Sequence, residues 1–442
     1  MIQGMAYPED LAATVHGYLR HARRPSPGLR SLKHLFEVMY SASLTTDESR
    51  FAAFHIVFLD PRHPDPNPPK RITRDRWDCM HFPQAVPLSA SSLVKLAMAS
   101  DPRSSSIAVW TSPRGSCMAW GLVDQGNAYY QFAHFEAEAA HLRPGTFQAS
   151  IAGLGHLVVY DGFAKVAELR DQSLVRGDVD ALRAGPVRDA LTPVIQQLVR
   201  DVRRDVGTRK SHEDSKVWDD SVADDIITAL CRILGRVHAY RHGGALLITP
   251  RPATGLRVKY PIHYDRLRTA LKRQAVSRIQ SAIANDTIFR QYMDREADFI
   301  PVDLYLDEAI SDDDLKESTT GIDGTLWFIS LLSRVDGVVV LTPDLTVKGF
   351  GGEITVTTRP TAVWRAADMH GRRLNSLDYE HLGTRHRSMM RYCARVRGSL
   401  GFVVSQDGDI RAITQAHGRL LVWENIRLEL YEFARLKKRS RI

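Results

Sequence analysis

Short apolar runs, separated by glycine, serine and proline turns, dominate the first 175 residues. The run FAAFHIVFL at 51–59 ends in the proline-rich segment 60–71, which neither a helix nor a central strand can continue. Further runs of strand length follow it, namely SIAVW, CMAWGLV, YYQFAHF, FQASIAGL and HLVVY. The pattern predicts a mainly β region over residues 50–175 that is preceded by helices.

The spacing of apolar residues becomes helical after residue 185. They recur every three or four positions in LTPVIQQLVRDV and VADDIITALCRILGRVHAY, and we expect the polar segment 207–220 between these helices to be an exposed loop. HGGALLITPRP is typical of a glycine turn that leads into a buried strand. A further helix is predicted over 264–283. Its basic face is interpreted as solvent-exposed rather than as a nucleic-acid surface, and it carries Arg266, Arg268, Lys272, Arg273 and Arg278.

The last part of the chain has an α/β pattern. A helix candidate, TLWFISLLSRV, leads into the β-rich run DGVVVLTPDLTVKGFGGEITVTT, and a helix at 384–396 precedes the strands GFVVSQ, DIRAITQ and RLLVWE. This order predicts an α/β domain over 321–442, in which flanking helices cover a mixed sheet. We expect a larger α+β region over 1–305, with 1–180 and 181–305 as its subdomains if it divides, and an acidic linker over 306–320.

Composition adds limits to this outline. A length of 442 residues favours two or three domains, and 44% hydrophobic with 25% charged residues is an ordinary globular balance. No window approaches the roughly 18 uninterrupted apolar residues of a membrane span. The first 21 residues lack the basic start and apolar core of a secretory signal, so we expect a cytoplasmic location and no membrane partner.

The net charge and the cysteine spacing limit the classes of ligand that the chain is expected to bind. The four cysteines are far apart in sequence, which makes a structural zinc cluster improbable and favours reduced thiols. The net charge of +8 is compatible with nucleic acid, an acidic membrane surface or a polyanionic small ligand. Because only the last few residues form a basic run, nucleic acid is the weakest of these readings.

Three local motifs carry candidate chemistry. Asp336 and Gly337 precede the run VVVL, and a glycine-rich segment follows one strand later with Gly349, Phe350, Gly351 and Gly352. By itself an Asp-Gly pair beside apolar runs indicates a turn. The glycines, however, allow a flat ligand or a phosphate to approach the backbone closely.

The second motif is GTRHRS at 383–388, at the predicted start of a helix. Gly383 precedes Thr384, which we expect to cap the helix and leave free amides at its positive end. Arg385 and Arg387 add planar donor groups that match phosphate oxygens, and His386 adds a titratable donor beside Ser388. The alternative is a helix that merely begins with basic residues.

The third motif is the predicted hairpin tip SQDGD at 405–409. As structure it indicates a tight Asp-Gly turn. Ser405 can donate a hydrogen bond to a phosphate, and Asp407 or Asp409 can hold a hard divalent cation, which prefers oxygen ligands.

In this order and spacing, the three motifs resemble those of the diadenylate cyclase family. That family carries Asp-Gly-Ala, Gly-Thr-Arg-His-Arg and a Val-Ser-Glu-Glu-type hairpin; this chain has Asp-Gly-Val, the complete second motif, and Val-Ser-Gln-Asp. The departures are Val338 for alanine and Gln406 for an acid, and the second puts metal binding at the hairpin in question. Upstream segments, LFEVMYSASLTTDESR, FLDPRHPDPNPP, WGLVDQ and RHGGALLI, resemble the DACNV sensor region that precedes such cyclase domains.

The resemblance implies that two ATP molecules are joined into cyclic di-AMP with release of two pyrophosphates. Asp336 would orient or deprotonate the attacking 3′-hydroxyl and share a Mg²⁺ or Mn²⁺ ion, with Asp407 as a second metal ligand. Arg385, His386 and Arg387 would hold the triphosphate. Thr384, Ser388 and Ser405 would add neutral donors, and the glycines 337, 349, 351, 352 and 383 with Phe350 would bind the rest of ATP.

The same resemblance implies a homo-oligomer with catalytic domains face to face, since one domain holds one ATP, and an upstream region that senses an unknown ligand. Two alternatives stay open. One is an inactive nucleotide-binding relative, motivated by Gln406 and Val338, and the other is a nucleic-acid-binding protein, which rests on charge alone.

Overall fold

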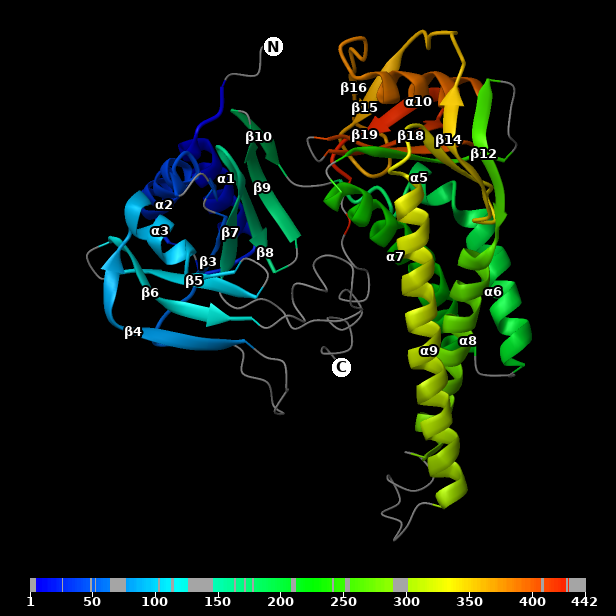
Figure 1. The fold of residues 1–442 in the computed structure, drawn as a ribbon, viewed down its shortest axis with the longest axis horizontal. Coiled ribbons are helices and arrows are strands. Elements are labelled where there is room, and N and C mark those ends of the chain that lie inside the picture. The colour runs from blue at the N-terminus through cyan, green and yellow to red at the C-terminus, as the bar shows by residue number, and fades with distance from the viewer. Residues whose placement is uncertain are drawn as a thin grey trace. The chain divides into compact units, whose positions relative to one another are not determined.

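The computed structural model divides the chain into two compact units, Met1–Asp178 and Val179–Ile442, which are described separately below (Figure 1). Within them the structure describes residues 5–25, 27–47, 50–51, 53–63, 77–101, 104–112, 115–125, 146–162, 164–170, 172–176, 179–207, 212–240, 242–250, 255–288, 301–406, 409–426 and 428.

Unit 1 is an eight-stranded sheet with helices on one face (Figure 1). The strand order is β10-β9-β8-β7-β3-β5-β6-β4, and only β3 and β5 are parallel neighbours. Its elements are α1 Pro8–His21, α2 Leu29–Ser43, β1 Thr46–Asp47, β2 Arg50–Phe51, β3 His55–Phe58, β4 Asp78–Pro87, α3 Ala90–Ala97, β5 Ser105–Thr111, β6 Cys117–Asp124, β7 Phe147–Gly153, β8 His156–Asp161, β9 Ala164–Arg170 and β10 Ser173–Arg176.

Successive side chains along each strand of unit 1 point to opposite faces of the sheet, and those on one face pack against the helices. Ile56 and Phe58 of β3 pack there with Leu35 of α2 and Leu11 of α1, and all four are at most 1% exposed. The predicted β region after two helices is therefore confirmed where the structure describes it, whereas YYQFAHF lies outside the described residues.

Unit 2 combines a nine-stranded mixed sheet with long helices (Figure 1). The strand order is β12-β14-β13-β11-β17-β18-β19-β15-β16, with parallel pairing at β11–β13 and β15–β19. Its elements are α5 Pro186–Asp189, α6 Thr192–Val206, α7 His212–Ala239, β11 Gly244–Ile248, β12 Leu256–Tyr264, α8 Arg266–Ile288, α9 Val302–Leu332, β13 Val338–Leu341, β14 Val347–Ile354, β15 Val363–Ala366, β16 Leu374–Ser376, α10 Thr384–Arg395, β17 Leu400–Val404, β18 Ile410–Ala416 and β19 Arg419–Trp423.

The long helices of unit 2 are joined by ion pairs. Arg268 of α8 contacts Asp201 of α6, whose side chain is only 7% exposed, and Arg278 of α8 binds Asp225 of α7 through both guanidinium nitrogens. Lys272 and Arg273 also reach acids, Asp205 of α6 and Glu317 of α9. The basic face of α8, interpreted as solvent-exposed, is exposed at Arg266 and Arg273. It is half-buried at Arg268, Lys272 and Arg278, where pairing with acids of neighbouring helices takes the place of solvent.

The predicted boundaries need three corrections. The acidic residues 306–320 are no linker but the middle of α9, which is continuous over Val302–Leu332 and packs along α8. Residues 181–305 do not form part of an N-terminal region, because β11 and β12 pair within the sheet of unit 2. The segment 207–220, expected as a loop, is helical from His212 onward.

The predicted α/β architecture of the last 120 residues is confirmed at the level of a mixed sheet flanked by helices. The expected helix at 384–396 is α10, and the last three expected strands are β17, β18 and β19. Among the described helices, none has the length and apolar character that crossing a membrane requires.

Candidate functional site

Asp336 and Gly337 lie in the short turn between α9 and β13. Gly337 has a φ of +120°, and a Cβ atom there would lie 2.6 Å from the carbonyl carbon of Gly351 and 2.8 Å from the oxygen of Gly352. The backbone of the first motif therefore lies directly against the glycine-rich strand β14. The Asp336 side chain, in contrast, is 86% exposed.

Replacing Gly337 by alanine is expected to lower the thermal midpoint of unit 2 by roughly 5 to 15 °C. The new Cβ overlaps backbone atoms that cannot rotate away, which we expect to cost about 2–4 kcal/mol. Scanning calorimetry measures this. The control is Gly321→Ala in α9, where nothing lies within 4 Å of the added carbon and the midpoint should stay level or rise slightly. Equal midpoints for both variants would contradict the close approach.

The second motif begins α10 as predicted, although with a different cap. Gly383 is the N-cap residue and no side chain caps the helix, so Thr384 is its first residue and the expectation that Thr384 caps was wrong. The Ser388 hydroxyl donates a hydrogen bond to the Arg385 carbonyl oxygen, 3.1 Å away. Among the described residues, the backbone amides of Thr384 and Arg385 have no acceptor, so they remain available at the positive end of the helix.

Arg385 joins the first two motifs. Its Nη2 lies 2.9 Å from Oδ1 of Asp336, and its Nη1 lies 3.5 Å from the carbonyl oxygen of His242. The hydrogen bond and charge of Arg385 hold the pKa of Asp336 below its ordinary value. Asp336 is therefore ionised at neutral pH, which suits a group that binds a cation or orients a hydroxyl better than a strong base.

The third motif lies beside Arg385. A Cβ on Gly243 would be 3.1 Å from Nη1 of Arg385 and 3.4 Å from the backbone nitrogen of Gln406, so Gly243 is where the hairpin and the arginine meet. Ser405 closes the hairpin, since its hydroxyl accepts from the Asp409 amide at 3.0 Å. Asp407, the expected second metal ligand, lies outside the described residues.

His386 does not share the exposure of its neighbours. It is 7% exposed, and its Nε2 lies 2.8 Å from Nη1 of Arg411 on β18. Because an arginine can only donate, Nε2 accepts and the ring is neutral with its proton on Nδ1. Burial, with Arg411 adding to it, lowers the pKa of His386 to about 4. His386 is thus a neutral group rather than a phosphate-binding cation.

Arg411 is itself fixed by two acids; sequence reasoning missed Arg411 and Glu424, and considered Asp409 only as a cation ligand. It lies 3.2 Å from Glu424 and 3.3 Å from Asp409, and its side chain is 12% exposed. The available signal was an arginine between apolar residues in the strand pattern IRAITQA. These contacts hold the His386 ring in one tautomer.

The stability of unit 2 should depend on pH because His386 is neutral in the folded state. An unfolded histidine titrates near pH 6.5, but folded His386 titrates near 4, so the unfolded state binds more protons between these values. The stability that neutral His386 contributes is therefore fully present above pH 6.5, and it is lost as the pH falls toward 4. His386→Gln is expected to flatten the decline of the thermal midpoint between pH 7 and 4.5, and His381→Gln, at an exposed histidine, serves as the substitution control. Parallel curves for wild type and His386→Gln would contradict the assignment.

The glycine-rich strand offers backbone and aromatic surface. Gly349 lies against Pro261 of β12, and the ring of Phe350 stacks on Tyr260 with centroids 4.9 Å apart. A Cβ atom added to Gly352 would lie 2.9 Å from Cγ1 of Val338, so the absence of a side chain at Gly352 makes room for this valine. Val338, which stands where the family has alanine, is therefore accommodated within the core.

The acids at this site are few. No group of three or more metal-ligating side chains occurs among the described residues. Within the described part of the chain, Asp336 is the exposed carboxylate that contacts Arg385, and Asp409 pairs with Arg411. This donor set fits Mg²⁺ or Mn²⁺ held by one carboxylate together with substrate phosphates, and it does not fit an all-protein cage.

Comparison with known proteins bears on unit 1. The family model described as "Probable sensor domain DACNV" matches residues 21–124, and this domain is associated with diadenylate cyclases. The match includes the first two of the four segments expected to resemble that region and the third up to Asp124. The fourth segment, RHGGALLI, lies outside the match, and its residues Gly244–Ile248 are β11 of unit 2. No curated protein and no solved structure matches the chain.

Proposed function

We propose that unit 2 is a diadenylate cyclase that condenses two ATP molecules into cyclic di-AMP, under the control of a DACNV-type sensor in unit 1. The observation that carries this proposal is the meeting of Asp336 and Arg385 at 2.9 Å, because it joins two motifs that are 49 residues apart in sequence. An ionised acid beside a phosphate-matching cation, at an uncapped helix start, is what phosphoryl transfer from a nucleotide needs.

In the proposed reaction each 3′-hydroxyl oxygen attacks the α-phosphorus of the facing ATP. The bond from that phosphorus to the β-phosphate bridging oxygen breaks, and pyrophosphate leaves. Asp336 accepts or orients the hydroxyl proton, while Arg385 and Arg387 bind the departing phosphates together with the free amides of Thr384 and Arg385. Neutral His386 keeps the start of α10 in place and offers Nδ1–H as a donor.

A bound Mg²⁺ or Mn²⁺ would neutralise phosphate charge and stabilise the negative charge that develops on the leaving pyrophosphate. Asp336 is the described residue suited to hold it. When ATP binds, Arg385 would leave Asp336 and pair with a phosphate instead. The Asp336 carboxylate would then be available to the cation and to the 3′-hydroxyl. The ion pair at 86% and 32% side-chain exposure is weak enough to be exchanged.

Two copies of unit 2 would act together, because one site holds one ATP. Mixing Asp336→Asn chains with Arg385→Ala/Arg387→Ala chains is expected to restore less than a tenth of wild-type turnover. Asp336 and Arg385 belong to the same site in one chain, so each mixed pair has two damaged half-sites. Substantial recovery of product would mean that one site takes its acid and its arginines from different chains.

An inactive nucleotide-binding relative is the second candidate. Gln406 in place of an acid favours it, since this position brings no carboxylate to Arg385. A nucleic-acid-binding role loses support, because the basic residues of α8 discussed above are paired with acids.

Incubating the purified full-length protein with ATP and Mn²⁺ or Mg²⁺, and identifying products by mass spectrometry, tests the proposal directly. Cyclic di-AMP together with two pyrophosphates per product supports the cyclase. ATP binding without product, in the presence of either cation, would support the inactive relative.

A further inference from the structure

A small cavity opens between three helices of unit 2. Its volume is about 140 Å³, and none of its lining residues belongs to the candidate site. Six of its eight lining residues are apolar, namely Val199, Val202 and Val206 of α6, Trp218 and Val222 of α7, and Ile279 of α8, and the other two are Arg203 and Asp219.

The amino-acid sequence creates this space. Val199, Val202 and Val206 recur on one face of α6, where their short branched side chains cannot reach α7 and α8 as leucines would. Val202 and Val222 are 2% and 1% exposed, so the floor of the cavity belongs to the core. The flat ring of Trp218 forms a further wall.

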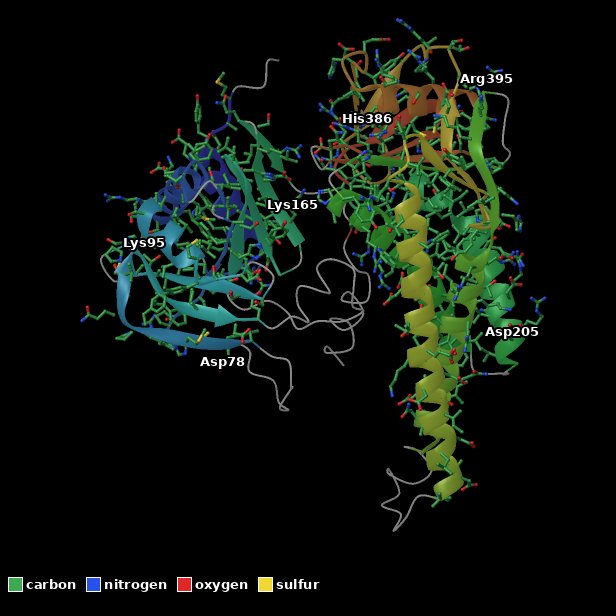
Figure 2. All side chains as sticks on the ribbon, viewed as in Figure 1. Asp78, Lys95, Lys165, Asp205, His386 and Arg395 are labelled. Carbon is green, nitrogen blue, oxygen red and sulfur yellow. The ribbon has the colours of Figure 1, made fainter. Side chains whose placement is uncertain are left out.

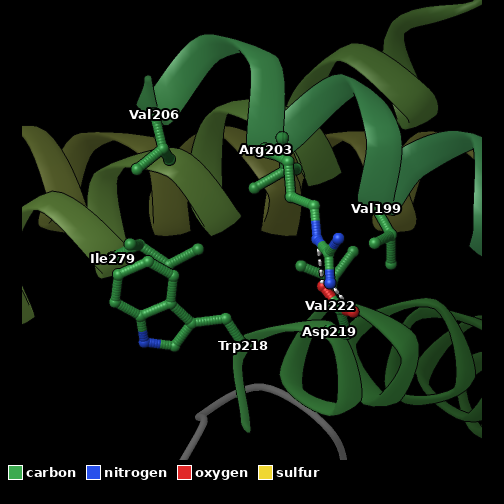
Figure 3. A pocket seen from close by; sticks show the side chains of 8 residues that line it. Val199, Arg203, Val206, Trp218, Asp219, Val222 and Ile279 are labelled. Atoms are coloured by element: carbon green, nitrogen blue, oxygen red, sulfur yellow. Dashed lines mark hydrogen bonds and ion pairs between the residues drawn. The ribbon is translucent and has the colours of Figure 1, made fainter. Parts of the chain in front are cut away.

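One side of the cavity is polar but electrically neutral. Arg203 and Asp219 form a two-contact ion pair across α6 and α7, with Nε 2.9 Å from Oδ1. Figure 3 shows this pair on one side and the Trp218 ring, with Ile279 beside it, on the other. Because each charge is compensated by the other, a charged ligand would gain nothing there without breaking the pair.

We propose that this cavity binds a neutral, compact apolar molecule, such as a single aromatic ring or a branched chain of about six to eight heavy atoms. A cavity of about 150 Å³ that is lined by Leu, Ile and Phe in another protein binds benzene, which sets the size of guest expected here. The wall of valines supplies apolar contact, and the indole ring favours a flat guest.

The cavity is also connected to the candidate active site through α7. This helix carries Trp218 and Val222 near one end, and the chain that follows its other end contains His242 and Gly243, which contact Arg385. Tyr240, between them, bonds to Ser330 of α9 at 3.0 Å. A guest that changes the packing of α6 on α7 therefore acts on the segment that holds Arg385, and this regulatory part rests on the proposed cyclase function.

Binding is tested with fluorobenzene and the full-length protein, followed by ¹⁹F NMR. Val199→Phe and Val206→Phe fill the cavity from half-buried positions, and Val302→Phe adds the same ring at an exposed position of α9. Wild type and Val302→Phe should bind the probe equally, and both filling variants should bind at least tenfold more weakly. Unchanged thermal midpoints establish that the variants are folded.

Equal binding by wild type and both filling variants, or no binding by wild type, would overturn the proposed site. ATP turnover with and without saturating fluorobenzene tests the coupling, and a change of twofold or more is expected in wild type and Val302→Phe only. Binding without any change in turnover would overturn the regulatory part alone. Absence of turnover in every sample would count against the cyclase, while the NMR result still decides the site.

Discussion

Replacing Asp336 by asparagine is expected to lower cyclic di-AMP formation at least 100-fold while ATP still binds. The substitution removes the only exposed carboxylate that the described residues bring to Arg385, and with it the group that orients the attacking hydroxyl. Arg385 loses its partner and becomes fully available to phosphate, so the affinity for ATP should stay level or rise. Mass spectrometry measures the product, and calorimetry measures ATP binding.

The matched control for this prediction is Asp378→Asn, another exposed acid of unit 2, which should leave turnover within twofold of wild type. Wild-type turnover by Asp336→Asn would remove Asp336 from the chemistry. A parallel loss of ATP binding would instead assign the carboxylate to the nucleotide itself, through a cation that ATP requires.

Much of the fold could be predicted from local pattern. The runs at β5, β7, β8, β17, β18 and β19 each combine strand length with flanking turns, and helical spacing identified α6, α7, α8 and α10. These elements bury a simple apolar face, so the periodicity of the sequence is enough to reveal them.

The boundaries failed where helix and strand depend on tertiary partners. Residues 306–320 look like a linker because they are acidic, but Arg273 pairs with Glu317 and Ser281 bonds to Asp312 along the contact between α8 and α9. β12 is a partly exposed edge strand whose alternation, LRVKYPIHY, was present in the sequence and overlooked. Its place beside β14 comes from pairing, which no local pattern contains.

The site was partly within reach of the sequence. Motif order identified Asp336 and Arg385 but could not show that they touch, nor that His386 faces inward to Arg411. The inward orientation of His386 depends on Arg411, which lies on strand β18 and is held by Glu424, and such a contact exists only after the sheet has formed.

Replacing both Arg385 and Arg387 by alanine is expected to weaken ATP binding by roughly 100- to 1,000-fold. Each charge-assisted contact to phosphate is worth about 1.5–3 kcal/mol. The expected loss of affinity is smaller than the full sum of two such contacts, because Arg385 gives up its ion pair with Asp336 when ATP binds. The Nε atoms of both arginines are buried and, within the described part of the chain, have no hydrogen-bond partner.

The control for these arginines is Arg395→Ala/Arg397→Ala, which removes the same charge from the far end of α10 and just beyond it. Figure 2 shows His386 and Arg395 at opposite ends of this helix, and both control positions are exposed. Calorimetry at a fixed salt concentration should find ATP affinity within threefold of wild type for the control. If both double variants lose affinity equally, the effect is one of overall charge and α10 begins with basic residues for solubility alone. A selective loss in Arg385→Ala/Arg387→Ala, with an unchanged thermal midpoint, assigns the triphosphate to the start of the helix.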